Sequence, residues 1–147
     1  MKSIATAVWE GSLKEGRGTV SAANGAFTGT PYSFAKRFEG AAGPGTTPEE
    51  LIAAAHSGCF AMALSGALVK ENFAPQRLTV RATVTLEPVD GKPTVTASVL
   101  ELDAVVPGID DVKFQAIAAE AKAGCPISRL LKANITLVAK LAQAAAR

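Results

Sequence analysis

The sequence contains two cysteines and one histidine, and all three could take part in chemistry. Cys59 lies in the stretch TPEELIAAAHSGCF, three residues after His56, and Cys125 lies between Gly124 and Pro126. A thiol reacts as its thiolate, which is stabilised by a helix N-terminus or a nearby cation. The two thiols therefore predict nucleophilic or redox chemistry, provided that other groups activate them.

The two cysteines have different predicted surroundings. Pro126 is expected to open a short helix, which places Cys125 at or beside an N-cap, where the pKa of a thiol is lowered. Cys59 falls inside a helix and gains nothing from a helix end. A thiol with its usual pKa near 8.5 is only about 3% ionised at neutral pH, so a reactive Cys59 needs a cation from elsewhere in the fold.

His56 is the nearest partner for Cys59, because side chains three residues apart share one helix face. A Cys/His pair would indicate a cysteine hydrolase or acyltransferase. Catalytic pairs usually converge from different elements, which favours His56 as a hydrogen-bonded structural residue instead. The spacing of Cys59, Cys125 and His56 matches no zinc site, so we expect no bound metal.

Arginine is the better cation for Cys59, since a guanidinium stays charged and carries several donors in fixed geometry. Two arginines are candidates: Arg37 in the stretch KRFEG and Arg17 in the stretch EGRG. Either could equally be a solvated surface charge. The residue types alone do not choose between them.

The elements that must position these residues are a mixture of strands and helices. The long helix has a clear start, with Thr47 as N-cap, Pro48 at the first helical position and Glu50 completing a capping box. We expect strands over 4–9, 18–22, 32–38, 77–87, 94–106 and 135–141, helices over 47–71, 110–124 and 126–132, and helical or frayed residues over 142–147. This order predicts one α+β domain over residues 1–147 with mainly antiparallel pairing.

The composition excludes several classes of protein. Hydrophobic residues make up 48% and charged residues 19% of the chain, and the net charge is only +2, so we expect a globular protein that does not bind nucleic acid. The uncharged stretch 51–69 is rich in alanine and contains His56 and Gly58, which argues against a membrane span. No secretory signal is visible, so we expect a cytoplasmic protein, where paired cysteines are usually catalytic or redox-sensing.

Several segments spread over nearly the whole chain resemble the family of osmotically inducible protein C (OsmC) and the organic hydroperoxide resistance proteins, in particular the OsmC branch. No single segment is specific, whereas the set is. The segments are WEG at 9–11, RFEG at 37–40, TPEELI at 47–52, AAH at 54–56 followed by CF at 59–60, VPGID at 106–110 and KAGCP at 122–126.

The resemblance implies an OsmC-like fold, with mainly antiparallel sheets packed around a long central helix in an intertwined homodimer. It also implies a thiol peroxidase that reduces organic hydroperoxides, with hydrogen peroxide as a further candidate, in defence against oxidative and osmotic stress. No cofactor is expected, because the reductant would be an external thiol such as dihydrolipoamide or a lipoylated protein.

The resemblance also assigns roles to site residues. Cys59 matches the peroxidatic cysteine, Cys125 the resolving cysteine, and Arg37 and Glu49 the residues that tune the thiolate. In the organic hydroperoxide branch the arginine comes from near the position of Arg17, so both arginines stay candidates, with Arg37 favoured.

Glu49 precedes Cys59 by ten residues, which is about 15 Å along one helix and too far for a shared site. A two-fold dimer with antiparallel central helices would bring Glu49 and Arg37 of one subunit towards Cys59 of the other. A ridge of small residues supports a close helix approach, unless it packs on the chain's own sheet; it consists of Ala53, Ser57, Ala61 and Ser65. We therefore predict a homodimer with interfacial active sites.

Two other functions remain possible at this stage. A Cys/His hydrolase would turn over esters through His56 without added thiol. A non-catalytic redox-sensing module would form a bridge between Cys59 and Cys125 on exposure to peroxide, without catalytic recycling.

Overall fold

The structure is a computed structural model that describes residues 1–142, so the tail predicted over 142–147 lies outside it except for Ala142. The described chain divides into two compact units, Met1–Leu51 and Ile52–Arg147. Each unit contains its own three-stranded sheet. The single domain over 1–147 stays a prediction.

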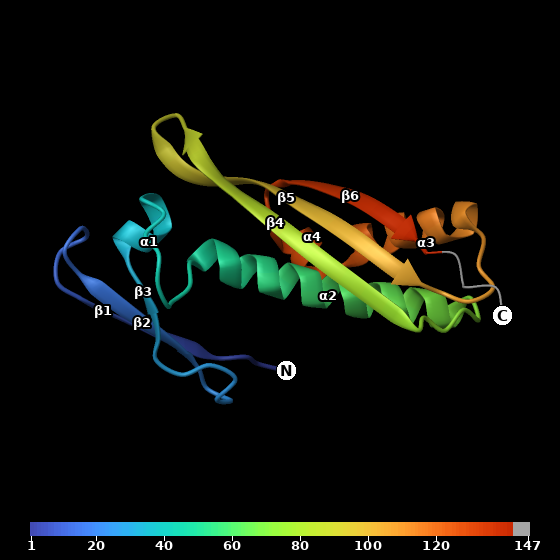
Figure 1. Ribbon diagram of the computed structural model, residues 1–147, viewed down its shortest axis with the longest axis horizontal. Coiled ribbons are helices and arrows are strands. Elements are labelled where there is room, and N and C mark those ends of the chain that lie inside the picture. Colours follow the sequence, from blue (N-terminus) through green and yellow to red (C-terminus); the bar gives the residue numbers. More distant parts are fainter. Residues whose placement is uncertain (143–147) are drawn as a thin grey trace. The chain divides into compact units, whose positions relative to one another are not determined.

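The first unit contains an antiparallel meander of β1 (Ala5–Glu10), β2 (Arg17–Ala22) and β3 (Thr30–Tyr32), drawn in blue in Figure 1. Gly18 on β2 is buried between two aromatic rings, those of Trp9 and Tyr32, whose centroids lie 5.4 Å apart. A Cβ at this position would stand 2.4 Å from the Tyr32 ring. Glycine is therefore required for the rings to close over the strand.

The strand predicted over residues 32–38 is wrong beyond Tyr32, because α1 (Phe34–Phe38) is a short helix. Ser33 is its N-cap, and the Ser33 Oγ accepts a hydrogen bond from the Lys36 N–H at 3.1 Å. The Phe34 and Phe38 rings pack 4.9 Å apart, as residues four apart on a helix do. The cap and this ring pair outweigh the β-propensity of the aromatic residues.

The long helix α2 (Pro48–Lys70) begins as the sequence predicts. The Glu50 N–H donates to Thr47 Oγ1 at 3.1 Å, and the Thr47 N–H donates to Glu50 Oε2 at 2.9 Å. This reciprocal pair is the predicted capping box. The helix ends one residue before the predicted limit, and Asn72 follows it with a positive φ of 65°.

The second unit contains β4 (Arg77–Val89), β5 (Lys92–Val105) and β6 (Asn134–Leu141), with β5 in the centre (Figure 1). Asp90 and Gly91 connect β4 to β5 with φ values of 50° and 74°, as in a type I′ hairpin turn. β6 pairs with β5 in parallel, since the chain returns through the helices α3 (Asp111–Gly124) and α4 (Pro126–Leu130). The predicted α+β class is confirmed, with this one parallel pairing.

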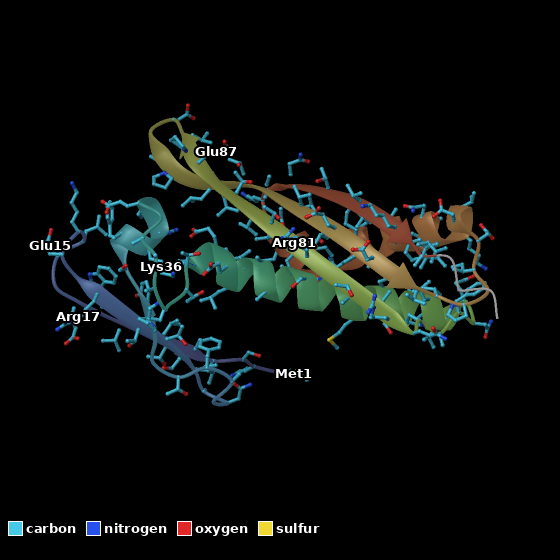
Figure 2. All side chains as sticks on the ribbon, viewed as in Figure 1. Met1, Glu15, Arg17, Lys36, Arg81 and Glu87 are labelled. Atoms are coloured by element: carbon cyan, nitrogen blue, oxygen red, sulfur yellow. The ribbon has the colours of Figure 1, made fainter. Side chains whose placement is uncertain are left out.

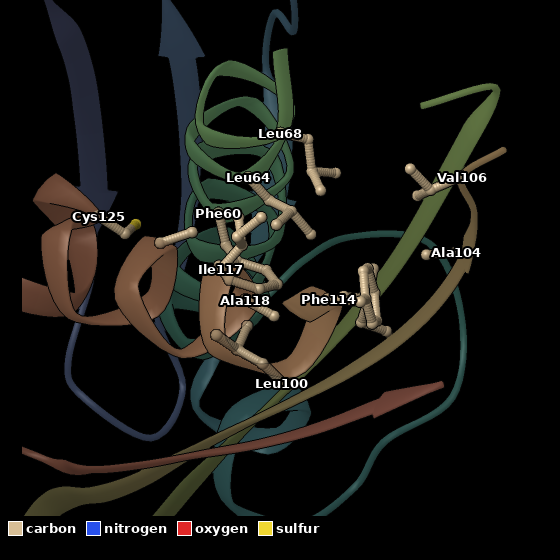
Figure 3. Close-up of a cluster of buried hydrophobic side chains, with 12 residues drawn as sticks. Phe60, Leu64, Leu68, Leu100, Ala104, Val106, Phe114, Ile117, Ala118 and Cys125 are labelled. Atoms are coloured by element: carbon tan, nitrogen blue, oxygen red, sulfur yellow. The ribbon is translucent and has the colours of Figure 1, made fainter. Parts of the chain in front are cut away.

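The hydrophobic core of the second unit lies between α2, α3 and β5 (Figure 3). Its largest fully buried side chains are those of Phe60, Leu64, Leu68, Leu100, Leu102 and Phe114. Burial of each such side chain contributes about 1.5–3 kcal/mol. The core thereby fixes α2, which carries Cys59, against the segment that carries Cys125.

Candidate active site

The structure brings together the two thiols that lie far apart in the sequence. Cys59 on α2 is half-buried, Cys125 between α3 and α4 is fully buried, and both are free thiols. Cys59 packs against the core cluster that contains Cys125, and the two side chains are within hydrogen-bonding reach of each other. Figure 3 shows the Cys125 sulfur turned towards α2. Each thiol shifts the pKa of the other, as expected for two neighbouring thiols.

Cys125 is the N-cap of α4, as predicted, and Pro126 follows it. Burial raises the pKa of this thiol, but hydrogen bonds from the Ser128 N–H, the Cys59 thiol, the Ile127 N–H and the Ser128 hydroxyl together hold its pKa below the usual value. The sulfur forms no fully aligned capping bond. The N–H groups of the first turn nevertheless favour the thiolate.

Cys59 is the weaker acid of the pair within its own unit. Burial raises the pKa of its thiol, and the nearby Cys125 raises it further, while the Ile127 N–H lowers it only in part. No cation is among the described groups that shift this pKa. The second unit by itself therefore does not activate Cys59. This agrees with the sequence-based prediction that a reactive Cys59 needs a cation from elsewhere.

His56 is fully buried and uses both of its ring nitrogens. Nδ1 lies 2.7 Å from Ser98 Oγ on β5, and Nε2 lies 2.8 Å from Ser128 Oγ on α4. Burial lowers the pKa of the ring, which keeps it neutral at physiological pH. His56 is thus a hydrogen-bonded residue inside the fold, and a hydrolase in which it acts directly on Cys59 loses support.

Arg37 and Glu49, which the resemblance assigns to the site, form an ion pair in the first unit. Arg37 Nη2 lies 2.6 Å from Glu49 Oε1, and Arg37 Nε lies 3.2 Å from each carboxylate oxygen. The guanidinium also lies 5.0 Å from the centroid of the Phe38 ring. The Arg37 side chain is 33% exposed and the Glu49 side chain 12%. The pair holds a guanidinium in a fixed orientation while leaving part of it open.

Arg17 has a different setting. It is exposed at the first position of β2, opposite Glu10 across the β1–β2 pair (Figure 2). Among residues 1–142 the ion pairs are Arg37 with Glu49 and Lys113 with Glu71, so Arg17 belongs to neither. This geometry favours Arg37 over Arg17 as the preorganised cation.

A pocket of about 220 Å³ lies beside Arg37 in the first unit. Its walls are largely apolar and aromatic, and Arg37 is the cationic residue among them. They consist of Trp9, Leu13, Tyr32, Ser33, Phe34, Arg37, Phe38 and Pro48. Such a pocket suits a small molecule with an apolar body and one polar end.

Two further observations concern the predicted absences. Residues 1–142 contain no group of three or more His, Cys, Asp or Glu side chains that could hold a metal ion. Helix α2 has the length and hydropathy of a membrane span, with a mean hydropathy of 1.6, but it is also the core helix of the second unit. The absence of metal and of membrane contact stays a prediction.

Sequence reasoning missed Ser98 and Ser128, the two partners of His56. Ser98 is an ordinary strand residue in the sequence, and nothing marks it. Ser128 stands three residues after the N-cap Cys125, which is the spacing at which an N3 side chain reaches back to its cap. This spacing was the one sequence signal that could have marked Ser128 as part of the site.

Comparisons with known proteins agree with the sequence segments. Residues 40–140 match the family model described as OsmC-like protein. Peroxiredoxin OsmC of Escherichia coli strain K12 is 49% identical over 129 residues, which cover 88% of this chain and 89% of that protein. The organic hydroperoxide resistance protein of Xanthomonas axonopodis pv. citri strain 306 is 30% identical, covering 75% of this chain and 76% of that one.

Solved structures show the same fold. An organic hydroperoxide resistance protein from Elizabethkingia anophelis matches with a TM-score of 0.70 and 25% identity, covering 98% of this chain and 99% of that one. An organic hydroperoxide resistance protein from Legionella pneumophila matches with a TM-score of 0.71 and 21% identity, covering 97% and 98%. The chain therefore belongs to the OsmC-like protein family and has the OsmC-like fold.

Proposed function

We propose that this protein is a thiol peroxidase that reduces organic hydroperoxides, and hydrogen peroxide as a second substrate, through a two-cysteine cycle. The observation that carries the proposal is the pair of free thiols, Cys59 and Cys125, within reach of each other at a helix N-terminus. The relatives named peroxiredoxin and organic hydroperoxide resistance protein support the same chemistry.

In the first half of the cycle, the Cys59 thiolate attacks one oxygen of the hydroperoxide. An S–O bond forms and the O–O bond breaks, so that the sulfur is oxidised to a sulfenic acid and the peroxide is reduced. The departing alkoxide takes up a proton and leaves as an alcohol. A guanidinium beside the sulfur would stabilise both the thiolate and the charge that develops on the leaving oxygen.

In the second half, the Cys125 thiolate attacks the sulfenic sulfur of Cys59. An S–S bond forms, the S–OH bond breaks, and the hydroxide leaves as water after taking up a proton. The lowered pKa of Cys125 suits this role, because the attacking group must be a thiolate. An external dithiol, such as dihydrolipoamide or a lipoylated protein, then reduces the disulfide by exchange and becomes a disulfide itself.

The cation for Cys59 is proposed to be Arg37 of a second subunit, oriented by Glu49. Within its own unit Cys59 has a raised pKa and no activating cation among the described groups. Glu49 and Cys59 are ten positions apart on α2, a rise of about 15 Å, which favours a site completed by a partner.

The surface of α2 supports such a homodimer. One line of the helix is buried in its own unit, formed by His56, Phe60, Leu64 and Leu68. The small-residue ridge of Ala53, Ser57, Ala61 and Ser65 is half-buried, and a neighbouring stripe is exposed, with Met62 79% exposed. Gly58 and Gly66 in that stripe have open space around them. A second α2 could pack closely there.

Light scattering tests this proposal. A protein that is monomeric and keeps full peroxidase activity would contradict the dimer.

The pocket beside Arg37 supports an organic substrate. Its apolar walls fit the alkyl or aryl group of a hydroperoxide, while the guanidinium fits the peroxide end. A role in oxidative stress defence follows from this activity, the family resemblance extends the proposal to osmotic stress, and a cytoplasmic location provides the reducing thiols that the cycle needs.

A steady-state peroxidase assay tests the proposal. Cumene hydroperoxide, t-butyl hydroperoxide and hydrogen peroxide are compared with dihydrolipoamide and then a monothiol as reductant, with Cys59→Ser as the control. We expect turnover with dihydrolipoamide, faster for the organic substrates. Ester hydrolysis that needs His56 and no thiol would support the hydrolase instead, and a disulfide that forms without recycling would support the redox-sensing module.

A further inference from the structure

A line of hydrogen-bonding side chains leads from the central strand of the second sheet to α4, whose N-cap is Cys125. Ser98 Oγ on β5 contacts His56 Nδ1 at 2.7 Å, and His56 Nε2 contacts Ser128 Oγ on α4 at 2.8 Å. His56 and Ser98 are both 0% exposed. A buried polar group without a hydrogen-bond partner costs free energy. Each hydrogen bond in this line must therefore have one donor and one acceptor.

The assignment of donors and acceptors along this line selects one tautomer of His56. Among residues 1–142 the hydrogen-bond partner of the Ser98 hydroxyl is His56 Nδ1, and Ser98 is fully buried away from water, so the hydroxyl proton points at Nδ1. Nδ1 is then the acceptor. A neutral imidazole has one donor and one acceptor, and burial keeps this ring neutral. Nε2 therefore carries the proton and donates it to Ser128 Oγ.

This arrangement fixes the direction of the Ser128 hydroxyl. Its oxygen accepts from His56, which leaves its own proton free to donate elsewhere. Ser128 stands at N3 of α4 and Cys125 at the N-cap, on one helical turn closed by the Arg129 N–H to Cys125 C=O bond of 3.0 Å. Side chains at these two positions are neighbours. Among residues 1–142 the hydrogen-bond partner of the half-buried Ser128 hydroxyl is His56 Nε2, so its own proton is uncommitted, and the Cys125 sulfur is an acceptor on the same turn.

We propose that His56 and Ser98 are positioning residues that hold the Ser128 hydroxyl as a hydrogen-bond donor to Cys125 Sγ. The donated bond stabilises the thiolate of Cys125 that attacks the Cys59 sulfenic acid, and it sets the sulfur towards Cys59. A contribution of the Ser128 hydroxyl to the lowered pKa of Cys125 agrees with this contact. The inference deepens the proposed function, on which its catalytic consequence rests.

The Ser128 and Ile127 N–H groups and the Cys59 thiol also lower the pKa of Cys125, and none of these groups is a cation. Cys59 is the titratable group that faces it from α2. On α3, Lys122 donates its ammonium to the Ile135 carbonyl at 3.2 Å, and on α4 the Arg129 side chain is exposed. The described groups that shift the pKa of Cys125 include no cation. Hydrogen-bond donors, rather than charges, therefore control this thiol.

The first test reads the tautomer directly. His56 is the only histidine in the chain, so ¹⁵N labelling of histidine gives one pair of ring signals. We expect a wild-type ring protonated at Nε2 and unprotonated at Nδ1, and a mixture of tautomers in Ser98→Ala. A wild-type spectrum in which the Nε2–H form does not dominate would overturn the inference.

The second test measures the Cys125 thiolate in the Cys59→Ser background, where Cys125 is the only cysteine. Thiolate absorbance in the ultraviolet is followed against pH. Ser128→Ala should lower the ratio of thiolate to thiol about tenfold at a given pH, and Ser128→Thr should restore it, since it keeps the hydroxyl. The matched control is Ser57→Ala, which removes a hydroxyl on α2 that, among residues 1–142, bonds to the Ala54 carbonyl at 3.1 Å.

The outcomes separate this inference from the proposed function. Superimposable titrations of the Ser128→Ala and parent proteins would overturn the inference whatever the enzyme does. Absence of peroxidase turnover in the wild type would overturn the function and leave the titration valid. If Ser128→Ala does not fold, Ser98→Ala is measured instead. It should lower the thiolate fraction of Cys125 by a smaller amount, and an unchanged thiolate fraction would contradict the inference.

Discussion

The two units of the chain hold reactive groups in contrasting ways. In the first unit, Arg37 and Glu49 are near in sequence, partly exposed, and joined by a bidentate ion pair between adjoining helices. In the second unit, Cys125 comes from a segment far from Cys59 and His56 on α2, and these groups are held by burial and neutral hydrogen bonds. The first unit supplies charge and the second supplies sulfur.

Under the proposed function, this contrast means that neither unit is a complete active site by itself. Cys59 has a raised pKa in its own unit, while the Arg37 guanidinium is oriented but has no thiol in its own unit, since both cysteines lie beyond Leu51. The Cys59 thiolate, which the Ile127 N–H stabilises only in part, needs a cation, and a preorganised cation acts best at a site shielded from water. Peroxidase activity should therefore depend both on the thiols of the second unit and on the Arg37–Glu49 pair of the first unit, and more strongly on the thiols.

Loss of sulfur should have the largest effect. Cys59→Ser removes the nucleophile and should lower kcat/KM by about 10⁴-fold or more. Cys125→Ser should permit at most one turnover and trap a sulfenic acid, detectable by mass spectrometry with a sulfenic-acid probe. Full activity in both variants would show that the thiol pair is not the reaction centre.

Loss of the cation should come next. Arg37→Met should lower kcat/KM for cumene hydroperoxide about 10²-fold, because the thiolate and the leaving oxygen both lose their stabilising charge. Arg17→Met is the matched control and should stay within about twofold of wild type, since Arg17 is exposed and belongs to neither described ion pair. The reverse order of the two variants would assign the role to Arg17.

A smaller effect is expected from the residue that orients the cation. Glu49→Gln keeps the shape of the side chain and removes the charge that pairs with Arg37, so kcat/KM should fall about fivefold, equivalent to about 1 kcal/mol. Glu50→Gln at the capping box is the control, because it should lower the melting temperature slightly and leave kcat/KM unchanged. A large loss in the control would mean that helix stability, and not the ion pair, controls the rate.

The smallest effect concerns acid stability. Burial lowers the pKa of His56, so below the usual histidine pKa of 6.5 the unfolded chain binds a proton that the folded chain resists. Stability is therefore complete above about pH 6.5 and falls as the pH drops towards the folded pKa, by up to about 1.4 kcal/mol for each pH unit. Urea unfolding at fixed protein concentration should show this slope in wild type and a weaker one in His56→Gln. Equal slopes would mean that His56 does not remain neutral in the folded protein.

Much of the local structure was predictable from particular residues. Thr47, Pro48 and Glu50 predicted the start of α2, and Asp110 predicted the cap of α3, where its Oδ1 accepts from the Lys113 N–H at 2.8 Å. The Asp90-Gly91 pair predicted the hairpin. These signals are local, because a cap or a turn is decided by a few neighbouring side chains.

Other features were not predictable from neighbours. Residues 34–38 suit a strand by their aromatic content, and the packing of Phe34 on Phe38 together with the Ser33 cap decides for a helix. The parallel pairing of β6 with β5 depends on how α3 and α4 cross the sheet. Ser98 and Ser128 look like ordinary serines until the fold places both at His56.

The sequence by itself determined the chemistry: two thiols, one of them at a helix start, one histidine, and an arginine followed by a glutamate at a second helix start. Residue type and short spacing suffice for this, since they set the reactive groups and their helix ends. Only the tertiary structure decided that Cys59 meets Cys125, that Arg37 pairs with Glu49, and that both nitrogens of His56 are occupied. Contacts between distant segments depend on the packing of the whole core, which no local pattern encodes.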